Sequence, residues 1–389
     1  MTGFYNCGLV QDNRPILYIC SYCGESFMLG QLSAPKNLCL LRLSAIGDVC
    51  HAVAMVQNIQ RQWPNTKITW VIGKVEASLL QGLHGVEFVI FDKRAGLKGY
   101  QDLKQALKGQ KFDVLLHMQV ALRASIASLC ISAKVKIGFD SQRAKEGQWL
   151  FSNKKIAKQS QPHVLDGFMG FAAALGLEVA APLWNMPLPD SDQLWASEKL
   201  SAGNPENKPI AVISPAASKA ERNWHAEGYS QTAEYLHACG FKVVICGGPT
   251  TMEKLLAEAI ISRSKFSQGD NEIQNLVGET SLKQLLAILK VAHLVVAPDT
   301  GPAHMAVTVE TPVVGLYAHS NPMRTGPYLY PQYVVSAYAA SIQQQYKKRV
   351  EQLPWGTRAK GKDLMMQISI AEVKKTIDRV IHDNYPEML

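Results

Sequence analysis

The sequence lacks an uninterrupted apolar run of the ~18 residues that a membrane-spanning helix needs. Its beginning has no basic residue before Arg14 and only a short apolar core, which is not the pattern of a secretory signal peptide. We therefore expect neither a membrane span nor a signal peptide, and a cytoplasmic location.

Cysteine is sparse: the chain has 8 in 389 residues, without the dense spacing of a small disulfide-bonded domain. Cys20 and Cys23 form a CxxC pair, but no second pair and no nearby pair of histidines completes a zinc site. We expect reduced thiols and no metal site.

The glycine fingerprint G-x-G-x-x-G of dinucleotide-binding proteins is also missing, which counts against a nicotinamide-dependent enzyme. The net charge of +8 favours anionic partners in general, namely nucleic acid, acidic lipid headgroups or phosphorylated small molecules. Nucleic acid is not expected as a partner, because the basic residues are dispersed and no recognisable nucleic-acid-binding module occurs.

Apolar strands alternate with helical segments in two stretches of the chain, separated by a proline-rich segment. Such strands between helices are typical of a parallel sheet covered on both faces. We predict an α/β fold of two doubly wound, Rossmann-like domains that face each other across a cleft. The expected parts are an N-terminal appendage (1–36), a first domain (37–180), a linker (181–208), a second domain (209–325) and a C-terminal extension with a terminal helix (326–389).

The stretch APDTGPAHMAV ends an apolar strand with residues suited to a helix start. Asp299 and Thr300 are able to cap a helix, and Gly301 allows close approach of the backbone. Pro302 fits an early helical position. Free amides at such a helix start form a site for an anion such as pyrophosphate. The alternative is a capped turn without a ligand, in which His304 only packs.

The first domain has a matching turn in LLRLSAIGDVCHAV. The strand ends at Ser44, and Asp48 begins the next helix with its carboxylate at the mouth of the cleft. Asp48 is then either an ordinary helix cap or a general base that removes a proton from an acceptor hydroxyl.

Two further strand ends in the second domain carry groups suited to phosphate. Ser218, Lys219 and Arg222 follow one strand in ISPAASKAERNW, and glycines with Glu253 follow the next in CGGPTTMEK. A lone basic residue is usually a solvated charge. We expect these strand ends to converge on the cleft with the anion site described above.

Basic residues are also clustered in the first domain, including Arg94, Lys98, Arg123 and Lys145. A run of charge is usually a solvated face. Because the base-like Asp48 belongs to the same domain, this surface also suits the negative groups of an anionic acceptor.

The motifs LRLSAIGDVCHA, KEGQWLFSNKKI, PHVLDGF and PDTGPAHMA together resemble those of bacterial heptosyltransferases of glycosyltransferase family 9. The likeness is to the type that adds the first heptose to the Kdo of the lipopolysaccharide inner core. It covers about residues 38–325 and extends to QLPWGTRAKGKDLM. It implies a GT-B fold, an ADP-heptose donor and an inverting single displacement with no cofactor and no obligatory metal.

The resemblance assigns Asp48 as the catalytic base. It matches Ser218 and Arg222 to a Thr and a Lys of better-known members, and it matches Lys145 to an Arg. The expected donor-binding residues are Ser218, Arg222, Glu253, Asp299, Thr300, Gly301, Pro302 and His304. The expected acceptor-binding residues are Arg94, Lys98, Arg123, Lys145 and His163.

The implied partners are ADP-heptose, a Kdo-lipid A acceptor and the anionic inner face of the cytoplasmic membrane, to which the protein attaches peripherally. One alternative is a family 9 enzyme that adds a later core heptose or another sugar. A more distant one is a nucleotide-binding protein without transferase activity.

Overall fold

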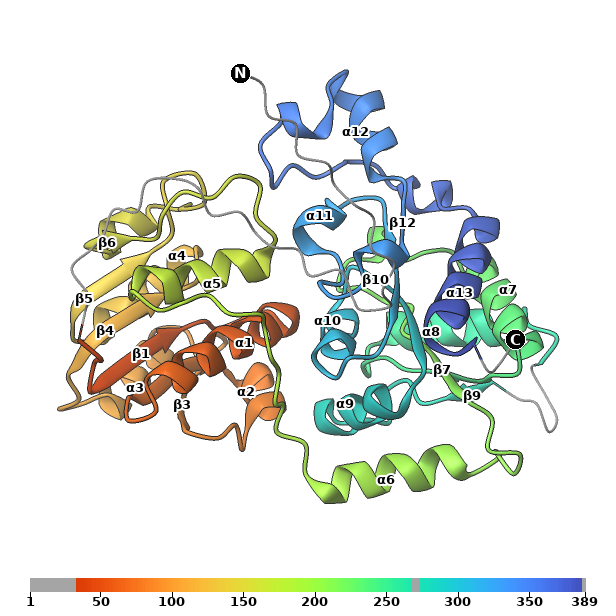
Figure 1. Ribbon diagram of the computed structural model, residues 1–389, viewed down its shortest axis with the longest axis horizontal. Helices are drawn as coiled ribbons and strands as arrows, with labels where there is room; N and C mark the ends of the chain where they lie inside the picture. The colour runs from red at the N-terminus through yellow and green to blue at the C-terminus, as the bar shows by residue number, and fades with distance from the viewer. Residues whose placement is uncertain (1–32, 267–272, 387–389) are drawn as a thin grey trace, which may run out of the picture.

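The computed structural model describes residues 33–266 and 273–386, which form two α/β lobes joined by a linker (Figure 1). The Cys20 and Cys23 pair, and nearly all of the expected N-terminal appendage, lie outside the described residues. Each lobe is built around one six-stranded parallel sheet. In the described residues no helix is both long enough and apolar enough to span a bilayer.

The first sheet is formed by the chain's first six strands. They are β1 (Asn37–Leu41), β2 (Lys67–Gly73), β3 (Val86–Phe91), β4 (Phe112–His117), β5 (Ala133–Gly138) and β6 (Lys154–Lys155). The second sheet consists of β7 (Ile210–Ile213), β8 (Lys242–Ile245), β9 (Gln274–Asn275), β10 (Leu294–Pro298), β11 (Val313–Tyr317) and β12 (Val334–Ser336).

Both sheets have the same strand order, which is β3-β2-β1-β4-β5-β6 in the first lobe and β12-β11-β10-β7-β8-β9 in the second. In each sheet, the first and fourth strands of the lobe are neighbours, and strands are added outward in opposite directions from this pair. Ligands of doubly wound proteins bind outside the carboxyl ends of the strands at this reversal point. The predicted fold class is confirmed, and the loops after β1, β4, β7 and β10 border these reversal points.

Helices cover both sheets. The first lobe has α1 (Ile46–Gln62), α2 (Lys74–Leu80), α3 (Leu97–Ala106), α4 (Leu122–Ala127), α5 (Val164–Ala174) and the short helices η1 (Ser128–Cys130) and η2 (Gln148–Phe151). The second has η3 (Ala220–Arg222), α7 (Ala226–Ala238), α8 (Thr251–Ile261), α9 (Leu282–Val291), α10 (Gly301–Thr308), α11 (Pro322–Thr325), η4 (Pro331–Tyr333), α12 (Tyr338–Tyr346), η5 (Val350–Gln352), η6 (Leu364–Gln367) and α13 (Ile370–Asn384).

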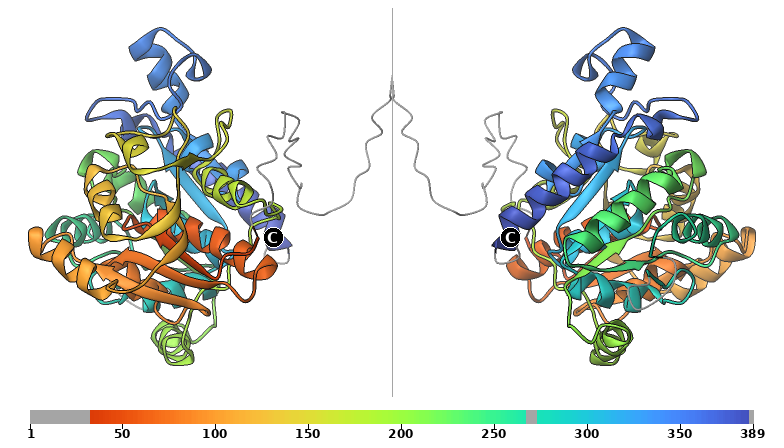
Figure 2. Two further views of the ribbon diagram at one scale, coloured as in Figure 1. Left: turned by 90° about the vertical axis from the view of Figure 1, so that its left-hand side faces the viewer. Right: turned by 90° about the vertical axis from the view of Figure 1, so that its right-hand side faces the viewer.

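The segment expected as a linker contains helix α6 (Asp190–Ser201), which packs on α9 of the second lobe. The edge strand β9 has only two residues, and β6 and β12 were not predicted from the sequence. β12 pairs with β11, so the second sheet continues beyond the predicted domain end at 325. The terminal helix α13 packs beside α7 on the second lobe (Figure 2).

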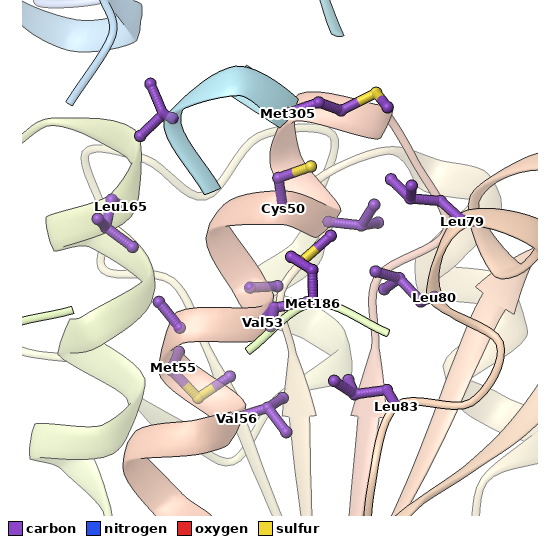
Figure 3. Close-up of a cluster of buried hydrophobic side chains, with 14 of the residues drawn as sticks. Cys50, Val53, Met55, Val56, Leu79, Leu80, Leu83, Leu165, Met186 and Met305 are labelled. Carbon is purple, nitrogen blue, oxygen red and sulfur yellow. The ribbon is translucent and has the colours of Figure 1, made fainter. Parts of the chain in front are cut away.

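The two lobes share one apolar core. Met305 of α10 lies beside Cys50 of α1 and Leu79 of α2, with Met186 of the linker below them (Figure 3). All four are buried. Burying apolar side chains from both lobes in one cluster stabilises a fixed arrangement of the lobes, and it holds the ends of α1 and α10 together.

Candidate active site

The starts of α1 and α10 meet where the two lobes adjoin. A side-chain carbon at Gly47 would overlap the His304 ring, and one at Gly301 would lie 3.1 Å from Ile46. Only glycine leaves room for this approach. The strand-end turns around Asp48 and Asp299, which the sequence predicted in separate domains, are therefore brought together.

Asp48 is the third residue of α1, and its Oδ2 accepts a hydrogen bond from the Ala45 amide at 3.1 Å. The same oxygen forms an ion pair with Arg42, while 30% of the Asp48 side chain remains exposed. The peptide bond between Ser44 and Ala45 is cis. Asp48 thus has the capping role, and it also presents a carboxylate to solvent as a general base requires.

Arg42 holds the Asp48 carboxylate from a rigid position. Its Nη1 donates to the Met118 carbonyl oxygen at 2.6 Å, and its guanidinium lies 5.1 Å from the centre of the Phe168 ring. Hydrogen-bonded and stacked arginines lose few rotamers when they form ion pairs. This partner of Asp48 was not predicted from the sequence.

The loop before Asp48 is held from the neighbouring strand end. Gln119 Oε1 accepts from the amides of Leu43 (2.7 Å) and Ser44 (3.2 Å). Gln148, from the motif KEGQWLFSNKKI, is fully buried and donates to the His117 carbonyl oxygen at 2.7 Å. This motif therefore supports the loop that carries the candidate base.

Asp299 is the corresponding carboxylate of the second lobe. Its Oδ1 lies 3.7 Å from His304 Nε2, and its Oδ2 lies 3.9 Å from Arg222 Nη1. Burial alone would raise the pKa of Asp299, but His304, Ser320 and Arg222 outweigh that effect and hold the pKa below its ordinary value. Asp299 is thus anionic at neutral pH.

Several buried polar atoms around Asp299 have no hydrogen-bond partner within the described part of the chain. They are Thr300 Oγ1, His304 Nδ1, His319 Nε2 and Asn321 Nδ2. Thr300 precedes α10 but its side chain makes no capping bond, unlike the cap the sequence suggested. Because buried polar groups normally have partners, this group is suited to a polar ligand.

Arg324 of α11 interacts electrostatically with the carboxylates of both lobes. Burial and the charges of Arg358 and Arg42 lower its pKa, and Asp48 and Asp299 both oppose that shift. The charges of Asp48 in one lobe and Asp299 in the other thus both act on Arg324, which is within electrostatic reach of both. Neither Arg324 nor Arg358 was predicted from the sequence.

Four arginines, Arg42, Arg222, Arg324 and Arg358, thus interact with one another's charges or with the two carboxylates. Such a group suits a doubly charged diphosphate. Within the described ranges no three His, Cys, Asp or Glu side chains are grouped to hold a metal ion.

His163, expected to bind the acceptor, is only 9% exposed, and both its ring nitrogens are used. Nδ1 accepts from the Leu165 amide at 3.1 Å, and Nε2 donates to the Gly326 carbonyl oxygen of the other lobe at 3.0 Å. Burial lowers the pKa of His163 to about 3. This geometry supports a bridge between the lobes and does not favour direct acceptor binding.

His51 of α1 lies between His163 and His304, with ring centres 5.2 Å and 4.8 Å away. Neither ring nitrogen of His51 has a hydrogen-bond partner in the described residues. Burial first, and then the two other histidines, lower its pKa well below the ordinary value. Three histidine rings thus line the contact between the lobes, and those of His51 and His163 have depressed pKa values.

The other expected donor-binding residues have different surroundings. Pro302 occupies an early position of α10 as expected, and Ser218 is exposed in the loop after β7. The Glu253 carboxylate accepts from the Gly248 amide at 2.8 Å and the Thr250 hydroxyl at 2.5 Å. Glu253 therefore orders the glycine loop before α8, and an indirect contribution to donor binding fits it better than contact with phosphate.

The remaining acceptor-binding candidates, Arg94, Lys98, Arg123 and Lys145, are all exposed on the first lobe. None of the four forms a salt bridge with another described residue. Their roles in acceptor binding stay a prediction.

Comparisons with known proteins agree with this architecture. A family model described as glycosyltransferase family 9 (heptosyltransferase) matches residues 100–354. The lipopolysaccharide core heptosyltransferase OpsX of Haemophilus influenzae is 44% identical over 340 residues, which cover 87% of this chain and 95% of that protein. The chain therefore belongs to glycosyltransferase family 9, and it is a glycosyltransferase of the heptosyltransferase kind.

Solved structures support the fold. A family 9 glycosyltransferase from Veillonella parvula has a TM-score of 0.73 at 19% identity, covering 90% of this chain and 97% of that one. The E. coli heptosyltransferase WaaC, solved with ADP, has a TM-score of 0.66 at 20% identity, covering 88% and 99%. The predicted GT-B arrangement is confirmed.

Proposed function

We propose that this glycosyltransferase moves a heptose from ADP-heptose to the Kdo of the lipopolysaccharide inner core, as the first heptose. The observation that carries the proposal is the meeting of the partly exposed Asp48 with the group around Asp299, at the adjoining starts of α1 and α10. The 44% identity to a core heptosyltransferase supports the sugar and the class of acceptor.

In the proposed reaction, the Asp48 carboxylate takes the proton from the attacking hydroxyl of the acceptor. The hydroxyl oxygen forms a bond to the anomeric carbon as the bond from that carbon to the β-phosphate oxygen breaks. Attack from the face opposite the leaving group inverts the anomeric centre. The electron pair of the broken bond leaves with ADP.

Negative charge develops on the departing diphosphate, and fixed positive groups stabilise it. Arg222, Arg324 and the amides at the start of α10 would supply this stabilisation. Thr300 and Asn321 carry unpaired buried polar atoms that fit a ligand's polar groups. The reaction as proposed uses no cofactor and no obligatory metal.

The proposed place of action is the inner face of the cytoplasmic membrane, with the protein attached peripherally. A lipid-linked acceptor would be presented there, and the excess positive charge of the chain suits an anionic surface.

The test is transfer assayed with purified protein, ADP-heptose and Kdo-lipid A, followed by ADP release and product mass. Addition of one heptose to Kdo-lipid A supports the proposal. Transfer only to an acceptor that already bears heptose would assign a later core heptose instead. ADP-heptose binding without transfer to any core acceptor would leave a nucleotide-binding protein.

A further inference from the structure

The first lobe exposes a stripe of large apolar side chains along α4 and η1. Leu122, Ile126 and Leu129 follow one another at intervals of four and three residues, which places them on one side of the helical segment. Each is more than a third exposed, and Leu129 is 66% exposed. A helix of a water-soluble lobe normally turns such a stripe inward.

Two neighbouring elements extend this apolar stripe. The Leu122 amide donates to the Glu146 carboxylate at 2.6 Å, which ties α4 to the loop before η2, where Trp149 and Leu150 are 55% and 67% exposed. Helix α3 contacts η1 and begins with Leu97, which is 82% exposed. We call these six side chains the α4–η2 surface: Leu97, Leu122, Ile126, Leu129, Trp149 and Leu150.

The other large apolar side chains exposed among the described residues do not gather in this way. They lie one to an element or in the segment before α6, for example Leu194 in α6 and Leu255 in α8. The α4–η2 surface therefore gathers exposed apolar side chains from neighbouring elements, and apolar surface gathered in this way is typical of interaction sites.

Positive charge is concentrated in the same part of the chain. Residues 92–158 contain fourteen Lys and Arg against five Asp and Glu, a net charge of +9, whereas the whole chain carries +8. Lys98, Arg123 and Lys145 lie within a few residues of Leu97, Leu122 and Trp149 along the chain, and all three are exposed. The apolar surface thus lies among cations that form no salt bridges within the described chain.

We infer that the α4–η2 surface docks on an anionic lipid bilayer, with its apolar side chains inserted among the headgroups and its cations on the lipid phosphates. A short helical apolar stripe with a tryptophan and flanking basic residues is what binding in the plane of a membrane interface requires.

The position of the surface relative to the candidate base supports this assignment. Helix α4 follows directly from the end of β4, and Gln119 in that connection holds the loop before Asp48. Docking through α4 would bring the edge of the sheet that carries Asp48 close to the bilayer. This step rests on the proposed function, because it explains how a lipid-linked acceptor reaches the base.

The experiment compares two double variants with equal changes in charge. Leu129→Glu with Leu150→Glu alters the α4–η2 surface, and Leu194→Glu with Leu255→Glu alters similarly exposed positions elsewhere. Binding of the full chain is measured by co-sedimentation with vesicles of phosphatidylcholine alone or with phosphatidylglycerol, at low salt. We expect the wild type and the Leu194/Leu255 variant to bind the anionic vesicles, and the surface variant to bind at least about tenfold more weakly.

Equal weakening in both variants, or unchanged binding by the surface variant, would overturn the inference. So would a wild type that does not bind anionic vesicles. Sedimentation velocity supplies a further arm: a wild-type dimer that becomes a monomer in the surface variant would make this surface an interface between two copies of the chain.

A water-soluble, deacylated Kdo acceptor separates this inference from the proposed function. We expect the surface variant to transfer heptose to that acceptor at the wild-type rate while losing its advantage on vesicle-bound acceptor. If the wild type binds vesicles but transfers no heptose, the proposed function fails and the docking surface stands. If the wild type transfers heptose but does not bind vesicles, the proposed function stands and the docking surface fails.

Discussion

Gly47 in the first turn of α1 lies directly against the ring of His304 in α10, so that a methyl group at position 47 would overlap the ring. We expect Gly47→Ala to force the lobes apart and to lower the free energy of unfolding by about 1–3 kcal/mol, the usual effect of overpacking. Transfer should fall too, because Asp48 is the next residue. Urea unfolding and initial rates measure both effects.

Gly356→Ala is the control for this substitution, because its added carbon would make only an ordinary contact with Arg324 Nε at 3.9 Å. Equal stability and activity of the Gly47→Ala protein and the wild type would contradict the close contact between α1 and α10.

The histidines between the lobes should make stability depend on pH. His163 has a pKa of about 3, against an ordinary value of 6.5, and the pKa of His51 is also depressed by burial. Below pH 6.5 these histidines therefore bind protons in the unfolded chain but stay unprotonated in the folded chain. Stability present above pH 6.5 is lost as pH falls toward 3, by up to about 1.4 kcal/mol per pH unit for each histidine.

Replacing His51 by Phe tests this origin, because the ring nitrogens of His51 have no hydrogen bonds to lose in the described structure. We expect His51→Phe to flatten the slope of unfolding free energy between pH 6 and 4 by about 1 kcal/mol per pH unit. The exposed His382 provides the control, His382→Gln. If His51→Phe leaves the slope of unfolding free energy against pH unchanged, the buried His51 is not its source.

Arg324 should contribute to binding the diphosphate. Removing its charge in Arg324→Gln should lower kcat/KM on the order of 100-fold and weaken ADP binding, because the charge of Arg324 interacts with both Asp48 and Asp299 and would stabilise the departing diphosphate. Calorimetric titration with ADP measures the second effect. The exposed Arg263, which follows the C-terminal end of α8, supplies the control Arg263→Gln, and equal effects of both substitutions would exclude a specific role for Arg324.

Chelation should not affect the reaction. The arginines around Asp299 and the start of α10 supply the positive charge that a divalent ion supplies in other transferases. Heptose transfer in excess EDTA should therefore proceed at the untreated rate. Loss of activity that Mg²⁺ or Mn²⁺ restores would require a metal in the mechanism.

The sequence was sufficient to predict the architecture because its central strands are continuous apolar runs between helical segments. It failed at the sheet edges, where β6 and β9 are two residues long and β12 has only three. Such short strands have too few side chains to show an apolar pattern, and they form because their backbones pair with a neighbouring strand.

The sequence predicted those parts of the candidate site that lie in a turn between a strand and the next helix. Asp299 follows β10 directly, and Asp48 lies in the first turn of the helix after β1, so their place at the cleft could be predicted from the sequence. Arg324 and Arg358 belong to segments far along the chain from Asp48, and only the tertiary fold brings them near. His163 shows the opposite case, since its motif was visible but its bond to Gly326 across the lobes was not.

The central claim is that Asp48 is the base, and Asp48→Asn tests it most directly. Asp113→Asn is the matched control, because Asp113 is also a first-lobe carboxylate in a salt bridge with 30% of its side chain exposed. With saturating ADP-heptose and Kdo-lipid A, we predict that Asp48→Asn loses about 10²–10⁴-fold in kcat while binding ADP as the wild type does, and that Asp113→Asn keeps its rate. Wild-type turnover by Asp48→Asn would contradict the account.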